Sequence, residues 1–333
     1  MQEHEQDLIA IVNEINKAST IVITAHWNPD GDAIGSSLAM YDALTTLGKK
    51  VIPVFPKHKI GASKILPNFD KITDVADFDF ESQPDLFIAL DCAETSRFCD
   101  SQFRKLLERC TTINIDHHYG NPLFGNFNYV IEDYSSTGEL IYNLMKFANW
   151  KISPDAAQAI WVSLITDTNN FAKPSAKQST FFCAADLLGL GVPASDLHDA
   201  IMHESVNVTN LRKRAYSSLE YWCNGQVAMI MVTKEDFRAT QTQKKDIDEF
   251  PNIPLMIKGP TIAILIYPIV EEENKIRFSL RSKQGAKISA LEIAQHFKGG
   301  GHKDAAAAFF YGGAEEAKAT LKRYLESVLL GKN

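Results

Sequence analysis

Short runs of β-branched and aliphatic residues alternate with helix-length amphipathic segments through the first part of the chain. Leu8, Ile11, Val12 and Ile15 recur at helical spacing. The short apolar runs predict buried strands at residues 20–24, 51–55, 86–90 and 111–115, and the segments between them predict helices, including 33–47 and 101–109. Strands that alternate with helices indicate crossover connections and therefore a parallel sheet.

Further helical patterns cover residues 136–147, 154–166, 178–188 and 194–203. After about residue 205 the pattern of hydrophobic positions changes, and a helical stretch is predicted at 207–222. Strand-like runs at 227–232, 261–269 and 275–280 then mix with two helices at 289–297 and 314–330. A chain of 333 residues has room for two domains. We expect an α/β protein with a parallel sheet flanked by helices at 1–190, a helical linker at 191–222 and a smaller α/β domain at 223–333.

Ionisable residues follow three of the predicted strands, at the point where each strand ends. These residues are His26, Asp30 and Asp32 after the first strand, Asp91 after the third, and Asp116, His117 and His118 after the fourth. Ligands of open parallel sheets bind outside the carboxyl ends of the strands, so these loops should open on one edge. Asp167 ends an apolar helical stretch and can reach the same edge.

Each of these residues also has a purely structural interpretation. Asp30 and Asp32 suit a turn and a helix N-cap, Asp91 suits a loop cap, His117 suits a buried core and Asp167 suits a helix end. A purely structural interpretation of all of them at once has a high cost in free energy, because two carboxylates ~4 Å apart repel by roughly 4 kcal/mol at an effective dielectric constant near 20. A convergence of four carboxylates therefore requires cations.

Oxygen and imidazole ligands without thiolate suit Mn²⁺, with Mg²⁺ as the alternative, better than a structural zinc ion. Four carboxylates balance the charge of two divalent ions. Two metal ions ~3.5 to 4 Å apart are the usual device for hydrolysing phosphoesters. The first prediction for function is therefore phosphoester hydrolysis.

The second domain carries a candidate phosphate-binding segment. Gly299, Gly300 and Gly301 allow a turn with exposed amides, and His302 and Arg281 can donate to phosphate. Between residues 275 and 303 the chain has seven lysines and arginines and one acidic residue. A flexible turn and a solvated basic surface are the structural alternatives.

Composition narrows the class of protein further. The net charge of −7 argues against a protein that coats long nucleic acid, and five cysteines without a Cys-x-x-Cys pair support neither a disulfide framework nor a zinc ribbon. Acidic residues at the N-terminus do not suit a signal peptide, and the most apolar run, residues 261–270, is too short to span a bilayer. We expect a cytoplasmic protein without a membrane partner, with a homodimer as one option.

Six spaced motifs resemble those of a known family. They are HWNPDGDAIGSSLA from His26, DCAETSRF from Asp91, the triplet Asp116-His117-His118, SSTGEL from Ser135, LITDT ending at Thr168 and GGGH ending at His302. In this order they resemble the DHH phosphoesterases with a DHH-associated C-terminal domain, and within them the soluble nanoRNase and phosphoadenosine-phosphate phosphatase group. The resemblance covers nearly the whole chain.

The resemblance implies a role for each site residue. One metal ion would be held by His26, Asp30 and Asp91, and the other by Asp32, Asp91, His117 and Asp167, with Asp91 as the bridge. His118 would face the substrate, Asp116 would orient a histidine, and the active site would lie in a cleft between the domains, with Arg281 and the GGGH segment binding substrate.

The implied activity is removal of mononucleotides from very short single-stranded RNA, together with hydrolysis of adenosine 3′,5′-bisphosphate to AMP. Hydrolysis of cyclic di-AMP or its linear product pApA is the enzymatic alternative. A nucleic-acid-binding module with an inactive metal site is the alternative of another class, and the intact set of candidate ligands counts against it.

Overall fold

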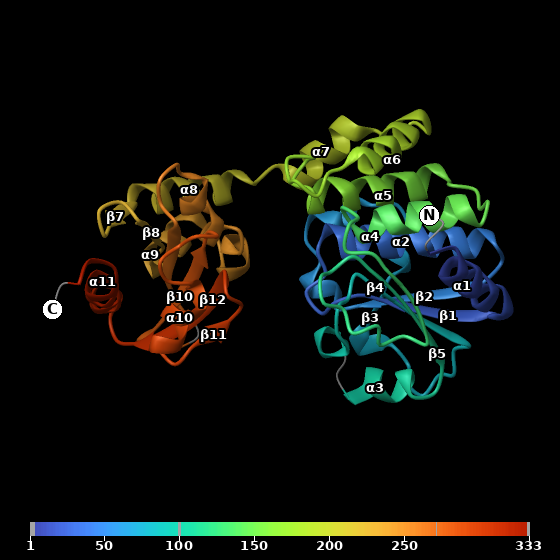
Figure 1. The fold of residues 1–333 in the computed structure, drawn as a ribbon, viewed down its shortest axis with the longest axis horizontal. Coiled ribbons are helices and arrows are strands. Elements are labelled where there is room, and N and C mark those ends of the chain that lie inside the picture. The colour runs from blue at the N-terminus through green and yellow to red at the C-terminus, as the bar shows by residue number, and fades with distance from the viewer. Residues whose placement is uncertain (1–3, 99–100, 271, 332–333) are drawn as a thin grey trace. The chain divides into compact units, whose positions relative to one another are not determined.

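The computed structural model describes residues 4–98, 101–270 and 272–331, and the chain divides into two compact units, Met1–His203 and Glu204–Asn333. Each unit has its own six-stranded sheet (Figure 1). The segment expected as a linker, residues 191–222, is divided between the units. Its first helix, α7 (Ala194–Met202), packs on α5 (Pro154–Asp167) of unit 1, whereas α8 (Val206–Ser217) packs on strand and helix elements of unit 2.

The sheet of unit 1 is parallel throughout, as the alternating pattern predicted. Its strands are β1 (Thr20–Thr24), β2 (Lys50–Phe55), β3 (Thr73–Asp74), β4 (Leu86–Leu90), β5 (Thr111–Asp116) and β6 (Phe127–Val130), in the order β3-β2-β1-β4-β5-β6. The direction of strand order reverses between β1 and β4. In open parallel sheets a ligand site forms at this reversal, because the connections leave the two strands on opposite sides.

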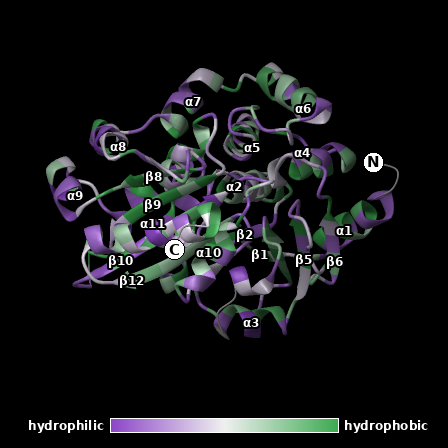
Figure 2. Cartoon of the chain, turned by 60° about the vertical axis from the view of Figure 1, so that its left-hand side comes forward, coloured by the Kyte–Doolittle hydropathy of each residue, from purple (hydrophilic) through white to green (hydrophobic). Residues whose placement is uncertain are grey.

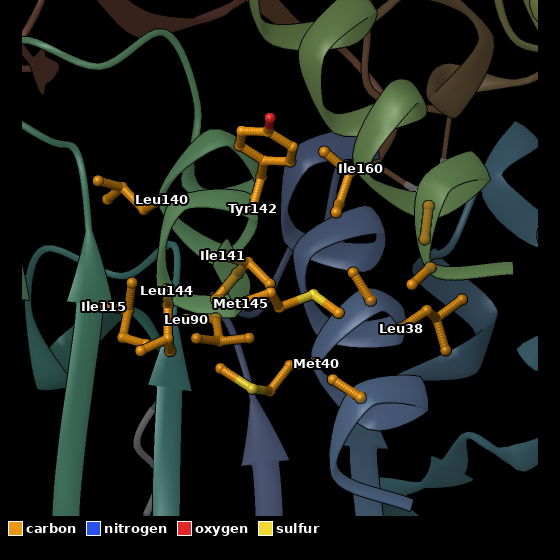
Figure 3. Close-up of a cluster of buried hydrophobic side chains, with 14 of the residues drawn as sticks. Leu38, Met40, Leu90, Ile115, Leu140, Ile141, Tyr142, Leu144, Met145 and Ile160 are labelled. Carbon is orange, nitrogen blue, oxygen red and sulfur yellow. The ribbon is translucent and has the colours of Figure 1, made fainter. Parts of the chain in front are cut away.

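Helices cover both faces of this sheet. The larger core joins one sheet face to α1 (Glu5–Lys17), α2 (Gly31–Thr46), α4 (Thr137–Phe147) and α5. Figure 3 shows part of this core, where side chains of α2, α4 and α5 gather beside Leu90 of β4 and Ile115 of β5. On the opposite face α3 (Ser101–Leu107) packs through Phe103 and Leu106 against Val22 and Phe87. Helices α6 (Gln178–Gly189) and α7 contact α5.

Close packing of α2 on α5 explains a glycine in the motif that follows β1. A Cβ atom at Gly35 would lie 2.4 Å from the carbonyl oxygen of Ala159, so only glycine allows this helix approach. The residues of α2 from Gly31 to Met40 are all buried. The start of α2, which carries Asp32, is therefore held rigidly inside the unit.

Unit 2 is built on a mixed sheet with helices on both faces. Its strands are β7 (Glu220–Trp222), β8 (Val227–Met231), β9 (Ile262–Pro268), β10 (Lys275–Ser282), β11 (Gly300–Gly301) and β12 (Ala305–Tyr311), in the order β11-β12-β10-β9-β8-β7. Only β8 and β9 pair in parallel. Helices α10 (Ala290–His296) and α11 (Ala314–Leu330) cover one face; α8, α9 (Lys234–Thr240) and the 3₁₀ segment η8 (Phe250–Met256) cover part of the other. The central strand β9 is hydrophobic along its length (Figure 2).

The prediction of one helix over residues 207–222 is wrong. Helix α8 ends at Ser217, and residues 220–222 form β7 because they pair with β8. Strands β3, β6, β11 and β12 were not predicted either. The alanine-rich β12 has a weak strand propensity, and its pairing with β10 and burial of Ala306 and Ala308 stabilise it instead.

Among the described residues, no single helix has both the length and the apolar character needed to cross a bilayer. Only α6 and α7 taken together, bent by 116° at the break between them, meet that test, and they do so by length and composition alone.

Candidate metal centre

The carboxyl ends of β1 and β4, together with the start of α2, bring a first group of ligand-type side chains together. His26 lies in the loop after β1, and its Nε2 is 3.4 Å from Oδ2 of Asp91, the residue after β4. The same Nε2 is 3.8 Å from Oδ2 of Asp30. One ligand atom from each of these three residues lies within 4.8 Å of the others. This is the spacing of side chains that can share one metal ion.

A second group surrounds His117, which follows β5. Its Nε2 lies 3.4 Å from Oδ2 of Asp32 and 3.4 Å from Oδ2 of Asp167, the last residue of α5. Asp91 approaches the same nitrogen through its other oxygen, Oδ1, at 3.7 Å. Asp91 therefore presents one carboxylate oxygen to each group. All six residues expected as metal ligands come together in unit 1.

The backbone of Asp91 is in the left-handed region, with φ of 51°. Few residues other than glycine adopt this conformation, and an aspartate held there is a sign of a constrained site. The amide of Asp91 donates to the carbonyl of Ile115 on β5 at 3.0 Å, and the residue is 2% exposed. Pairing with β5 thus fixes the turn that aims this carboxylate.

Three donors hold the buried Asp32. The amides of Thr137 and Gly138, at the N-terminus of α4, donate to Oδ2 at 2.9 Å and Oδ1 at 3.1 Å, and the hydroxyl of Ser163 donates to Oδ1 at 2.5 Å. A helix N-terminus stabilises a carboxylate through its free amides and its dipole. Thr137 and Gly138 lie in the SSTGEL motif, but the motif alone predicted no role for them, and Ser163 was not predicted as a site residue.

Asp30 has both of the functions that the sequence left open. Its Oδ1 caps α2 by accepting from the amides of Asp32 at 3.0 Å and Ala33 at 3.1 Å. Its Oδ2 faces His26. A cap uses only one carboxylate oxygen, so the structural and the ligand interpretations are compatible.

Asp116 is hydrogen-bonded to His118. The Nδ1 atom of His118 lies 2.7 Å from Oδ1 of Asp116, and Asn121 donates to Oδ2 of Asp116 at 2.7 Å. Burial acts to raise the pKa of Asp116, but the hydrogen bonds to His118 and from Asn121 outweigh it and lower that pKa. With Nδ1 engaged by Asp116, the opposite ring nitrogen of His118 is left for another partner. Nδ1 of His118 is also 3.5 Å from Oδ1 of Asp91.

The electrostatics of the centre favour cations. Burial lowers the pKa of His26, yet the nearby carboxylates of Asp30 and Asp91 raise that pKa to about 10. Burial and the charge of Asp91 raise the pKa of Asp32 well above its ordinary value, and burial raises the pKa of Asp167. Carboxylates this close are stabilised by protons or by metal ions. Carboxylate oxygens and imidazole nitrogens are ligands that fit divalent metal ions.

In unit 2 the conformation of the glycine segment differs from the flexible turn considered for the sequence. Gly300 and Gly301 form β11 rather than a loose turn, and β11 pairs with β12. A Cβ at Gly299 would lie 2.2 Å from the carbonyl oxygen of Ala307, and Gly301 has a φ of 142°. Gly299 and Gly301 therefore serve close packing, whereas Gly300 has open space around it and His302 is exposed.

Arg281 is half-buried and lies on β10, which pairs with β12 on the side opposite β11. Its Nε donates to the side-chain oxygen of Asn252 at 3.2 Å, and its Nη1 donates to the carbonyl of Leu280 at 3.0 Å. Partial burial lowers the pKa of this guanidinium from its ordinary value, but an arginine remains charged. The sheet thus brings Arg281 and Gly300 to strands on either side of β12.

Comparison with known proteins agrees with this division of the chain. A model of the DHH family, N-terminal domain, matches residues 20–164, and a model of the DHHA1 domain matches residues 224–329. The bifunctional oligoribonuclease and PAP phosphatase NrnA of Thermus thermophilus is 30% identical over 96% of this chain and 92% of its own length. The protein of the same name from Bacillus subtilis is 26% identical over 90% and 92%.

Solved structures share the fold. The crystal structure of an exopolyphosphatase-related protein from Bacteroides fragilis has a TM-score of 0.84 and 27% identity, and 98% of each chain is covered. Exonuclease RecJ bound to manganese has a TM-score of 0.54 at 15% identity, covering 99% of this chain and 96% of that chain, which is a likeness of fold alone. The motifs, the two matched domains and these relatives lead to one conclusion: the chain belongs to the DHH family and carries a DHHA1 domain in its second unit.

Proposed function

We propose that this protein is a metal-dependent phosphoesterase that releases mononucleotides from very short RNA and converts adenosine 3′,5′-bisphosphate to AMP. The observation that carries the proposal is the position of Asp91, whose two oxygens face two separate groups of ligand-type side chains. The names of the relatives, oligoribonuclease and PAP phosphatase, supply the substrate classes.

The distances between these side chains divide them into two groups, each suited to one divalent ion. His26, Asp30 and Asp91 would hold one ion, and Asp32, Asp91, His117 and Asp167 would hold the other. We assign Mn²⁺, with Mg²⁺ as the alternative, because the set contains hard oxygen donors together with imidazoles. When bound, such a pair supplies a hydroxide nucleophile and neutralises the charge of the phosphoryl oxygens.

The remaining residues of the centre bind and orient. His118, held by Asp116 through Nδ1, directs its other ring nitrogen to the substrate, where it donates a hydrogen bond or a proton to the phosphate or the leaving group. Thr137, Gly138 and Ser163 fix the orientation of Asp32.

We assign substrate binding to unit 2 through Arg281, His302 and the segment of Gly299, Gly300 and Gly301. Among the glycines, only Gly300 has open space where a side chain would stand, so its backbone is the part that a phosphate can approach. Arginine can make a bidentate contact with a phosphate that is not being cleaved. A substrate cleft between the units, a homodimer and a cytoplasmic location stay predictions.

A substrate panel tests the proposal. The full chain is assayed with Mn²⁺ and with Mg²⁺, before and after chelation, on adenosine 3′,5′-bisphosphate, pApA, cyclic di-AMP and labelled RNA of two to ten nucleotides. We expect activity on the shortest RNAs and on the bisphosphate, and we expect chelation to abolish this activity. Preference for cyclic di-AMP would move the function to the signalling nucleotides. Binding of RNA without hydrolysis of any substrate would contradict an enzymatic function.

A further inference from the structure

A further group of ligand-type side chains lies in unit 1 and shares no residue with the metal centre. It consists of His198 and Asp199 on α7 and His203, the residue that follows this helix. One ligand atom from each of the three residues lies within 4.8 Å of the others. The proposed function gives these residues no role.

The position of α7 on unit 1 explains why the three side chains meet. Apolar residues at helical spacing pack on the core of the unit, and these are Ala194, Leu197 and Ile201. His198 borders this apolar stripe and is half-buried, whereas Asp199 and His203 are exposed. The amide of His203 donates to the carbonyl of Asp199 at 3.2 Å, so the two residues lie one helical turn apart on the same side.

The interactions among the three side chains are weak. Nε2 of His203 is 3.8 Å from Oδ1 of Asp199, and an exposed ion pair of this length adds little to stability. The rings of His198 and His203 lie edge to face with their centres 5.9 Å apart. Nδ1 of His198 is buried and has no hydrogen-bond partner among the described residues, although most buried nitrogen atoms have one. These contacts therefore do not explain why two imidazoles and a carboxylate gather here.

We propose that His198, Asp199 and His203 bind a Zn²⁺ ion at a site separate from the metal centre. Imidazole nitrogen and carboxylate oxygen are ligands that zinc uses in proteins, and with three protein ligands a water molecule completes its four-coordinate shell. Sites with these donors bind Zn²⁺ more tightly than Mn²⁺. Because Asp199 and His203 are exposed, the ion can reach the site directly from solvent.

Zinc bound here joins the last turns of α7 to the chain that leaves the helix. His203 has an extended backbone, with φ of −83° and ψ of 133°, and it is the last residue of unit 1. Its side chain and two side chains of the helix share one ion, so binding restrains the end of unit 1. The ion is thus a structural ligand of α7 and takes no part in the hydrolysis.

The test locates Zn²⁺ residue by residue, because the metal centre can also bind this ion. The metal-free full chain is treated with diethyl pyrocarbonate, with and without free Zn²⁺ at about 1 μM, where a site with a Kd of about 1 μM is half filled. Mass spectrometry then identifies the modified histidines. We expect Zn²⁺ to protect His198 and His203. The modification of His58 should not change, because this histidine is exposed and belongs to no ligand group in the described part of the chain.

His203→Asn tests the site with little risk to the fold, because it removes an exposed side chain and leaves the apolar stripe of α7 intact. Equilibrium dialysis should show that this variant binds one Zn²⁺ ion fewer per chain than the wild type. Zn²⁺ should slow hydrogen exchange of the amides at the end of α7 in the wild type and not in the variant. Asp199→Asn should weaken Zn²⁺ binding at the same site, and His58→Asn is the matched control that should bind as much Zn²⁺ as the wild type. Thermal melting in EDTA shows whether each variant is folded.

Several results would overturn the zinc site. They are unchanged modification of His198 and His203, protection only at millimolar Zn²⁺, wild-type stoichiometry in a folded His203→Asn protein, or an equal loss in His58→Asn. Protection of His26 and His117 alone would refute this site and leave the metal centre in place. Protection of His198 and His203 in a protein that hydrolyses no phosphoester would support the zinc site and contradict the proposed function.

Discussion

Ser163 is the residue whose removal tests most directly how the metal centre is held. Its hydroxyl donates to Oδ1 of the buried Asp32 at 2.5 Å and accepts from the amide of Gly138 at 3.0 Å. Ser163→Ala removes this donor and leaves the candidate ligands in place. We expect weaker binding of Mn²⁺, because Asp32 is then less firmly oriented towards His117.

Two independent estimates of the magnitude agree. A hydrogen bond to a charged group contributes about 1.5 to 3 kcal/mol. Loss of a partner that orients a metal ligand typically lowers metal affinity about 10- to 100-fold, which corresponds to about 1.4 to 2.8 kcal/mol. Asp32 keeps the amides of Thr137 and Gly138 as donors. The expected loss therefore lies near the lower end, about tenfold.

The assay is a calorimetric titration of the metal-free protein with Mn²⁺, repeated as activity against Mn²⁺ concentration. High Mn²⁺ should recover most of the rate in Ser163→Ala. The matched control is Ser37→Ala, because Ser37 is equally buried in unit 1 and its hydroxyl has no hydrogen-bond partner in the part of the chain that the structure describes. Thermal melting in EDTA shows whether either variant is folded.

Wild-type Mn²⁺ affinity in a folded Ser163→Ala protein would refute the reasoning, since Asp32 would then need no help from α5. An equal loss in Ser37→Ala would also refute it, because a generic cavity effect would explain both variants.

Three further predictions follow from the same centre. Asp91→Ala removes the one carboxylate that faces both groups. Calorimetry should therefore show impaired binding of both Mn²⁺ ions, and turnover should fall by several orders of magnitude; retention of two ions would disprove the bridging role. His118→Ala should bind Mn²⁺ normally and hydrolyse slowly, and Asp116→Asn should reproduce part of this defect; a full rate in His118→Ala removes it from the chemistry. The pKa of His26 is raised to about 10 in the protein alone, so at neutral pH a metal ion must displace its proton. Mn²⁺ affinity should therefore rise with pH up to that value, and titrations in buffers of different ionisation enthalpy should detect proton release; an affinity independent of pH between 6 and 9 would contradict this.

Much of the metal centre could be predicted from local sequence. Runs such as residues 20–24 and 86–90 are too short and too apolar for anything but buried parallel strands, and the polar residues that end them must then share one edge. This reasoning located His26, Asp91 and His117 without any tertiary information. Asp167 was found in the same way, from the end of an apolar helix.

Elements of unit 2 were harder to predict because their conformation depends on distant partners. Residues 220–222 continue a helical pattern in the sequence but form β7 through pairing with β8. The sequence of the glycine segment predicts a flexible turn, yet Gly300 and Gly301 form a strand because they pair with β12. The alanines of β12 carry almost no strand signal of their own.

The sequence by itself determined which residue types gather at the edge of the first sheet, because strand ends and periodicity are local properties. Only the tertiary structure decided how Asp32 is held, since its donors Thr137, Gly138 and Ser163 lie 105, 106 and 131 residues away along the chain. Which side of a strand is exposed is likewise decided by what packs against it. The exposure of Phe309 on β12 and the burial of Phe278 on β10 cannot be inferred from spacing alone.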